Sequence, residues 1–182
     1  MVKYNPLKPE RSNFEMEEIR IHPDPILTKK AKPVETIDGK VKDIADRRAE
    51  VMYAKKGIGL AAPQIGIPSR ILIVDLGGVR RVLINPEVIE EEGESIMEEG
   101  CLSLPNIGVQ VRRKDRVLIR GWDLECKEIH LELFGFESRV YQHEIDHLNG
   151  ILMIHHLPRI KRELLVKRML KSLKRFKEEE PL

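Results

Sequence analysis

The stretch His143-Glu144-Ile145-Asp146-His147 decides how the rest of this sequence is interpreted. It is an H-E-x-x-H pattern within residues 137–148, a segment predicted to be a helix that stops just before Gly150. Four residues advance a helix by about 40° beyond one full turn, so His143 and His147 lie on the same face and can bind one metal ion. Glu144 lies beside them, within reach of a water at that metal. The alternative is a surface helix with exposed histidines, because the pattern also occurs by chance.

Two histidines do not complete a catalytic metal site, which usually takes three protein ligands and leaves a position open for water. In the longer metalloprotease pattern H-E-x-x-H-x-x-G-x-x-H, this sequence keeps Gly150 but has Met153 where the third histidine belongs. His155 and His156 come two and three residues later. A metalloendopeptidase that uses one of them is therefore disfavoured, but it stays open at this point.

The competing third ligand is Cys101, which lies in Glu99-Gly100-Cys101-Leu102-Ser103. A cysteine thiolate favours Zn²⁺ or Fe²⁺, and the glycine before it lets the backbone approach a metal closely. Taken alone, an inert buried thiol is the more common role for such a cysteine. The identity of the third ligand therefore decides the class of enzyme.

A third segment is rich in small residues and reads Gly57-Ile58-Gly59-Leu60-Ala61-Ala62-Pro63-Gln64. Such a loop is rigid and can lie against a substrate, and the carboxamide of Gln64 can donate a hydrogen bond to a developing oxyanion. The alternative is an ordinary turn that ends a helix, since Gly-x-Gly alone is a weak signal.

Taken together, these three segments resemble the corresponding motifs of the peptide deformylases, which remove the formyl group from nascent bacterial proteins. The motifs are GIGLAAPQ at 57–64, EGCLS at 99–103 and QHEIDH at 142–147. The similarity covers roughly residues 17–157 and includes IRIHPDPIL at 19–27, INP at 84–86 and DHLNG at 146–150. Two departures are local: the arm before Glu17 is longer than usual, and Cys126 stands in a hairpin turn where the family commonly has glycine.

The resemblance implies that Cys101, His143 and His147 are the metal ligands. It also implies that Glu144 takes a proton from the attacking water and delivers it to the departing amine. The tetrahedral oxyanion would be met by the metal, by the side-chain amide of Gln64 and by the backbone N–H of Leu102. The implied metal is Fe²⁺ in the cell, with Zn²⁺ or Ni²⁺ as substitutes.

The substrate implied by the resemblance is a formyl-methionyl nascent peptide, which needs an apolar pocket beside the metal. Val140 shares the helix face of the two histidines, and Ile58 and Met97 match pocket-lining positions of the family. Core packing is as good an explanation for all three. An extended peptide would lie along an exposed strand edge, with Gly59 as a candidate backbone partner.

The rest of the sequence predicts one α+β domain with antiparallel sheets packed around the H-E-x-x-H helix. A further helix is expected over about 41–55, and strands are expected over 71–76, 79–84, 109–111, 117–120 and 128–133. Residues 1–16 are expected to form an extended arm, 17–158 the catalytic domain, and 159–182 a basic amphipathic helix that belongs to the same domain.

The chain has 182 residues and a formal net charge of +2, but the charge is unevenly distributed. Residues 159–177 carry a net charge of +8 and the rest of the chain carries −6.

No apolar run approaches the ~20 residues of a membrane-spanning helix, and the first twenty residues lack the apolar core of a secretory signal. A cytoplasmic protein without membrane contact is therefore expected. Two cysteines exclude a disulfide scaffold, and Cys126 is interpreted as structural.

The C-terminal helix has an apolar face made of Leu165, Val166, Met169, Leu170, Leu173 and Phe176. That face can simply pack on the domain, with the charged face in solvent. In similar proteins such a helix contacts the ribosome near the nascent-chain exit, and phosphate contact of this kind weakens with salt. Direct DNA binding is not expected. A non-enzymatic RNA-binding module with a structural metal is the remaining alternative, although structural zinc sites normally have four protein ligands.

Overall fold

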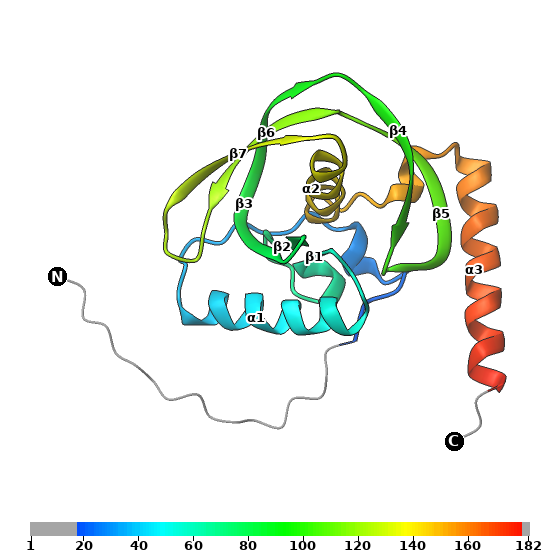
Figure 1. The fold of residues 1–182 in the computed structure, drawn as a ribbon. Coiled ribbons are helices and arrows are strands. Elements are labelled where there is room, and N and C mark those ends of the chain that lie inside the picture. Colours follow the sequence, from blue (N-terminus) through cyan, green and yellow to red (C-terminus); the bar gives the residue numbers. More distant parts are fainter. Residues whose placement is uncertain (1–17, 180–182) are drawn as a thin grey trace.

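The computed structural model describes residues 18–179 of the chain (Figure 1). The arm expected over residues 1–16 lies outside the described residues. The elements follow in the order η1 (Pro25–Thr28), α1 (Gly39–Ala54), β1 (Gly59–Ala61), η2 (Ala62–Ile65), β2 (Ile71–Leu76), β3 (Val79–Glu92), β4 (Ser95–Cys101), β5 (Leu104–Arg113), β6 (Arg116–Trp122), β7 (Glu128–Phe134), α2 (Gly135–Leu148), η3 (Met153–His156) and α3 (Arg159–Glu179). The η elements are single turns of 3-10 helix.

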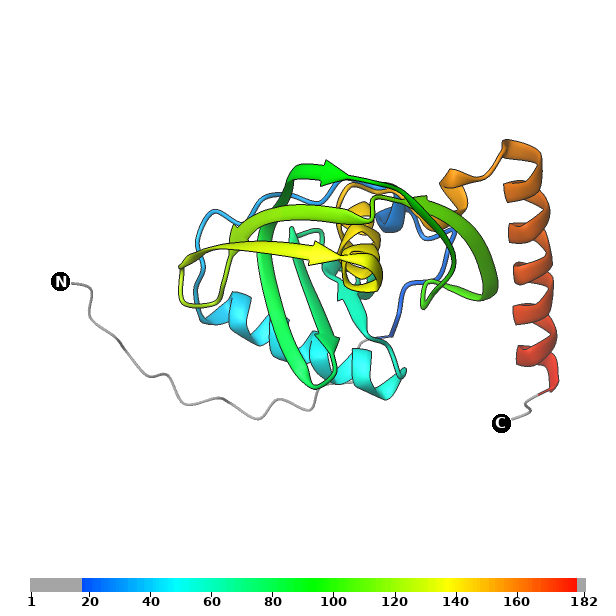
Figure 2. The ribbon, with the colours of Figure 1, turned by 45° about the horizontal axis from the view of Figure 1, so that its top comes forward.

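The strands form two antiparallel sheets, which confirms the predicted α+β class. One sheet has five strands in the order β1-β2-β3-β6-β7, and the other pairs β4 with β5. The helix α2, which carries residues 143–147, lies between the two sheets, and α1 runs along the outer side of β1 and β2 (Figures 1 and 2). The buried side chains of α2 pack with buried side chains of the larger sheet in one apolar core. On α2 these are Val140, Tyr141, Ile145 and Leu148.

Strand β3 is longer than the predicted 79–84 and continues to Glu92. Residues 87–92 show no apolar alternation, because most of them are exposed acids. Arginines of β6 pair with these acids instead: Arg116 contacts Glu90 at 3.1 Å, and Arg120 contacts Glu87 at 2.7 Å. Cross-strand charge pairs therefore replace the apolar pattern by which a strand is recognised.

Strand β4 was not predicted, and β5 extends well beyond the predicted 109–111. Most of β4 is exposed, and its one fully buried side chain is an acid, Glu99. A buried acid in a strand cannot be recognised from periodicity, because acids are normally taken to mark the solvent face. The register of β4 on β5 shifts between Glu99 and Cys101, so the strand pair is irregular where Cys101 begins the turn into β5.

The helix α3 packs along β5 and η3 at one side of the molecule (Figure 2). Met169 is buried, and Leu165, Val166 and Leu173 pack beside it against a core cluster that includes Leu27. Leu170 was expected on the apolar face of this helix, but it is 40% exposed and does not belong to the packed face. The side chain of Phe176 lies outside the described residues.

The hairpin turn between β6 and β7 contains Cys126, which has a φ of +61° and an exposed side chain. A positive φ is the conformation that favours glycine, which gives a physical reason for the glycine expected at this turn.

Among residues 18–179, no helix is long and apolar enough to cross a membrane.

The chain leaves α2 through Gly150, whose φ is +73°. A Cβ at this position would lie 2.7 Å from the backbone of Thr28. Both the backbone conformation and the close approach of the two segments therefore require glycine.

We predict that Gly150→Ala lowers the free energy of unfolding by roughly 2 kcal/mol, because alanine adds a steric clash to a strained φ. Urea unfolding in the presence of a chelator measures the effect without a contribution from bound metal. The matched control is Gly39→Ala at the start of α1, where a Cβ would meet nothing within 4 Å. Equal stability of the two variants would contradict this explanation.

Candidate metal centre and cavity

Three potential ligands from two different elements meet beside α2. Cys101 ends β4, whereas His143 and His147 lie one turn apart on α2. One ligand atom from each residue lies within 4.8 Å of the others, and Cys101 Sγ is 3.2 Å from His147 Nε2. The structure thus brings together the three side chains that the family resemblance implies as ligands.

The ring of His143 is oriented by Glu99. His143 Nδ1 lies 3.0 Å from Glu99 Oε2, which leaves Nε2 directed toward Cys101 and His147. Burial alone would raise the pKa of Glu99, but hydrogen bonds from His143 and Arg113 hold that pKa well below its usual range. Glu99 is therefore a carboxylate, which can accept the Nδ1 proton of His143 and keep Nε2 available as a metal ligand.

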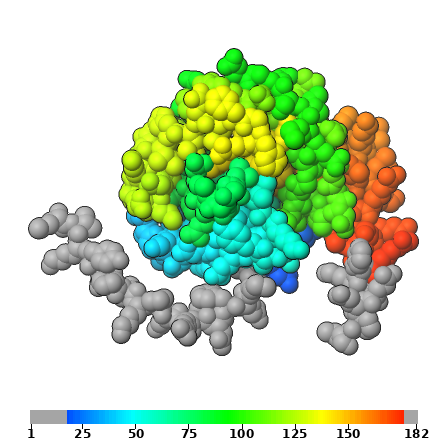
Figure 3. All heavy atoms as spheres, viewed as in Figure 1, coloured from blue at the N-terminus to red at the C-terminus, as the bar shows by residue number. Residues whose placement is uncertain are grey.

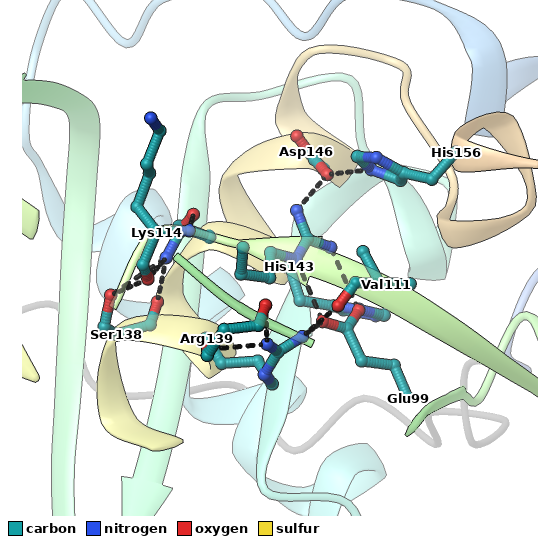
Figure 4. Close-up of polar contacts among 11 residues, drawn as sticks. Glu99, Val111, Lys114, Ser138, Arg139, His143, Asp146 and His156 are labelled. Atoms are coloured by element: carbon teal, nitrogen blue, oxygen red, sulfur yellow. Dashed lines mark hydrogen bonds and ion pairs between the residues drawn. The ribbon is translucent and has the colours of Figure 1, made fainter. Parts of the chain in front are cut away.

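Two buried arginines hold Glu99 in place (Figure 4). Arg113 donates from Nε and Nη2 to both carboxylate oxygens, at 2.9 and 3.0 Å. Arg139 donates from Nη1 to Glu99 Oε1 at 2.7 Å and to the carbonyl of Val111 at 2.9 Å. Arg113 also contacts Asp146 of the H-E-x-x-H stretch. Glu99 thus accepts four hydrogen bonds from β5 and α2.

The two histidines have opposite electrostatic surroundings. Burial lowers the pKa of His147 well below its usual value, and the nearby positive charges of His143 and Arg113 lower it further. Burial also acts to lower the pKa of His143, but hydrogen bonds to Cys101 and Glu99 outweigh it and raise that pKa. His147 is therefore neutral, the form in which an imidazole binds a metal.

Glu144 is buried against the small-residue loop. A Cβ on Gly59 would lie 2.5 Å from Glu144 Oε1, so a larger residue at position 59 would force this carboxyl group to move. Glu144 Oε2 is buried and has no hydrogen-bond partner in the described part of the chain. Burial raises the pKa of Glu144 to about 7. Such a group can accept and release a proton near neutral pH.

The amide of Gln64 has a fixed orientation. Gln64 Oε1 accepts a hydrogen bond from the backbone N–H of Ala61 at 2.8 Å. Its Nε2 therefore points the other way, 3.3 Å from Ser103 Oγ and 3.8 Å from Cys101 Sγ. A buried amide donor thus lies next to the proposed ligand cysteine.

Cys101, His143, Glu144 and Gln64 line a cavity of about 840 Å³. Gly59, Ile58 and Val140 line it, as does Leu102, whereas Met97 is 43% exposed and is not among the lining residues. Sequence reasoning did not find several other lining side chains, which are Glu18, Ile19, Ile21, Lys55, Lys56, Pro105, Asn106 and Phe136. Ile19 and Ile21 belong to the IRIHPDPIL stretch, whose similarity to the family was noted without assigning these residues a role, and the others lie outside the motifs. In Figure 3 the end of α1 lies beside the β4–β5 unit on the face of the molecule that is shown.

The alternative third ligands are placed elsewhere. Met153 is buried in the core cluster under α3. His155 Nδ1 accepts a hydrogen bond from the backbone of Leu152, and His156 Nε2 lies 3.1 Å from Asp146. Among the described residues, only Cys101, His143 and His147 form a group of three that could hold a metal ion.

The donor set fits a divalent transition metal. One thiol and two imidazoles are ligand types shared by Zn²⁺ and Fe²⁺, and three protein ligands leave coordination positions open. Glu99 orients the imidazole of His143, as carboxylates that are hydrogen-bonded to ligand histidines do in metal sites. The geometry thus supports a metal site, and it does not distinguish between metals.

The chain is similar to known proteins over most of its length. A family model described as polypeptide deformylase matches residues 16–163. A peptide deformylase of Thermodesulfovibrio yellowstonii is 46% identical over 156 residues, which is 83% of this chain and 94% of that protein. A peptide deformylase of Halothermothrix orenii is 47% identical, covering 81% of this chain and 97% of that protein. The crystal structure of a peptide deformylase from Legionella pneumophila has a TM-score of 0.86 and 37% identity, covering 91% of this chain and 99% of that one.

We predict that Glu99→Gln lowers the free energy of unfolding by about 3 kcal/mol, because the buried guanidinium groups of Arg113 and Arg139 lose their compensating charge. Chemical unfolding of the metal-free protein measures the loss. Glu94→Gln is the matched control, since Glu94 pairs with Arg112 at an exposed position and its loss is expected to change the unfolding midpoint little. If the two variants unfold alike, Glu99 does not hold this region together.

Proposed function

This chain belongs to the polypeptide deformylase family, and on that premise we propose that the Cys101–His143–His147 cluster is the centre of its activity. The activity is metal-dependent hydrolysis of a linear amide: the formyl group is removed from formyl-methionine at the start of nascent polypeptides, and formate is released. The observation that carries the proposal is the convergence of these three ligands at a cavity that Cys101 and His143 line together with Glu144 and Gln64. The endopeptidase alternative is not favoured, because its third histidine lies elsewhere.

Cys101, His143 and His147 would hold the metal, with Glu99 fixing the ring of His143. A bound divalent metal supplies Lewis-acid activation of water and of the formyl carbonyl. We assign Fe²⁺ as the metal in the cell and Zn²⁺ or Ni²⁺ as substitutes, on the basis of the family resemblance.

Glu144 carries the proton transfers. Its unpartnered Oε2 is available to take a proton from the attacking water, and its raised pKa lets it return that proton to the departing amine. One carboxyl group thus serves first as base and then as acid.

The developing oxyanion would receive hydrogen bonds from Gln64 Nε2 and from the backbone N–H of Leu102. The support for Gln64 is its fixed orientation, because its Oε1 is already held by Ala61. A donor that does not reorganise during the reaction is worth more than a mobile one.

The methionine side chain would occupy the apolar part of the cavity, with Ile58, Val140 and Met97 as its contacts. Ile58 and Val140 line the cavity, which supports the first two. The backbone of the substrate would lie along β1, which is an edge strand of the larger sheet, and Gly59 would be its backbone partner.

We further propose that the enzyme acts in the cytoplasm and reaches its substrates through contact of α3 with the ribosome. The support is the exposed side chains of Lys167, Arg168 and Lys171, which lie on the side of α3 away from Met169. The packing of Met169 against the core also supports our assignment of 159–182 to the same domain as 17–158.

The activity is tested by formate release from a formyl-Met-Ala-Ser peptide, assayed anaerobically with Fe²⁺ and with a chelator. We predict that Cys101→Ala loses both metal and turnover. Glu144→Gln keeps the metal and loses turnover, because it removes only the proton carrier. Gln64→Ala keeps the metal and loses about 100- to 1000-fold in kcat. Metal content is measured on the same samples.

The matched control is Cys126→Ala, which removes the other free cysteine, an exposed one outside the cavity. It is expected to keep both metal and turnover. Full turnover by Glu144→Gln would refute the role of Glu144, and full metal content in Cys101→Ala would refute the ligand assignment.

Ribosome contact is tested by co-sedimentation with ribosomes. We predict that the triple variant Lys167→Glu, Arg168→Glu, Lys171→Glu binds ribosomes more weakly and with a smaller salt dependence, since fewer phosphate contacts form. The control reverses three exposed lysines elsewhere, Lys30, Lys40 and Lys42. Equal binding by both triple variants would exclude a specific role for α3.

A further inference from the structure

The end of α1 places a lysine in a backbone conformation that favours glycine. Gly57 N–H donates to the carbonyl of Met52 at 2.8 Å, and Lys56 N–H donates to that of Tyr53 at 2.9 Å, which is the hydrogen-bond pattern of a helix C-terminus closed by a left-handed residue. Lys56 is that residue, with a φ of +56°. Glycine or asparagine is usual there, because a side chain with a Cβ is strained at positive φ.

Lys56 lies at the cavity of the proposed active site. Lys55 and Lys56 both line this cavity, together with Gly57, Ile58 and Gly59. A Cβ on Gly57 would be 3.0 Å from Leu102 Cδ1, so this segment packs directly against the residue that follows Cys101. The strained residue is therefore part of the wall that a substrate would pass.

Neither lysine is used to stabilise the fold through a salt bridge. Within the described part of the chain, no carboxylate lies within salt-bridge distance of Lys55 or Lys56, although many other cations of the protein are paired. The nearby Asp75 is hydrogen-bonded to Tyr53 and to the backbone of Gly78. The two ammonium groups are exposed and available to a ligand.

The acids that line the cavity are Glu18, Glu98, Glu99 and Glu144, and none of them forms a salt bridge with Lys55 or Lys56. Glu98 lies against β5, because a Cβ on Gly108 would be 2.7 Å from its Oε1. Glu99 is held by Arg113 and Arg139. Glu144 lies against Gly59, and Glu18 lines the cavity beside Ile19, which packs against α1. Since neither lysine has a salt-bridge partner among the described residues, the end of α1 contributes two unpaired positive charges to the cavity.

The position of the lysines relative to β1 determines which part of a substrate they would meet. The reacting end belongs beside Glu144 and Gln64, next to Gly59 and Ala61. The cavity continues from Gly59 toward Lys55, and it is not lined by Leu60 or Ala61. A peptide that follows the cavity thus runs antiparallel to β1. At about 3.3 Å per residue, its third and fourth residues reach the level of Lys56.

We propose that Lys56, assisted by Lys55, binds acidic side chains at the third and fourth residues of the formylated peptide and so makes the enzyme prefer acidic N-termini. This inference rests on the proposed deformylase function. Glycine at position 56 would remove the strain of the positive φ, and the charge of Lys56 explains why a lysine stands there instead. Favourable interaction of a lysine with the C-terminal end of the α1 dipole is the competing explanation, and it predicts no effect on substrate choice.

The test compares formate release from formyl-Met-Ala-Asp-Asp, formyl-Met-Ala-Asn-Asn and formyl-Met-Ala-Lys-Lys by the metal-loaded full chain. We expect kcat/KM to be about two- to fivefold higher for the Asp peptide than for the Asn peptide, a ratio typical of exposed charge pairs. The Lys peptide is expected to be the poorest substrate. The preference is expected to decline as the salt concentration rises.

Lys56→Gly is the decisive variant, because glycine suits the positive φ and the fold is retained. It is expected to keep or raise the melting temperature and to lose most of the preference for Asp over Lys. Lys56→Glu is expected to reverse the preference. The matched control is Lys42→Glu, a charge reversal on α1 outside the cavity, which is expected to leave the preference unchanged.

The outcomes separate this inference from the proposed function. If none of the three peptides releases formate, the proposed function fails. If the Asn peptide is deformylated but the wild type does not distinguish Asp from Lys, or Lys56→Gly keeps the wild-type preference, the role of Lys56 is overturned. If Lys42→Glu changes the preference as much as Lys56→Glu, the effect comes from overall charge and the inference is also overturned.

Discussion

The site depends on one buried carboxylate, that of Glu99. It accepts hydrogen bonds from Arg113 on β5 and from Arg139 and His143 on α2, while its own strand, β4, ends two residues later at Cys101. A buried charge is costly unless it is fully paired, so these elements must come together as a unit or leave charges unpaired. The same contacts that compensate Glu99 fix the distance between Cys101 and the histidines.

This dependence explains why the helical motif alone could not define the site. The spacing of His143 and His147 follows from helix geometry, and both were predicted correctly to share a face. Cys101 comes from β4 of the two-stranded sheet, and its position is set by the irregular register of β4 on β5. No local pattern specifies such a register. The resemblance to the deformylases supplied Cys101 as third ligand, whereas the residues alone left His155 and His156 open.

The fold was predictable where apolar periodicity was intact. The helix expected over 41–55 is Gly39–Ala54, and the one expected over 137–148 is Gly135–Leu148. Prediction failed for β4 and for the second half of β3, which are rich in acids. In β3 the acids are exposed and paired with arginines across the sheet, and in β4 the acid is buried. Both arrangements depend on partners that are distant in sequence.

The small-residue loop at 57–64 is explained by packing from two sides. Gly59 is required because Glu144 lies against it, and Gly57 packs against Leu102. Gln64 is almost fully buried, with its amide oriented by Ala61. The glycines at 57 and 59 therefore leave room for groups of α2 and of the β4–β5 turn. A larger residue at 59 would displace the Glu144 carboxyl group, so the placement of the proposed proton carrier depends on the glycine at this position.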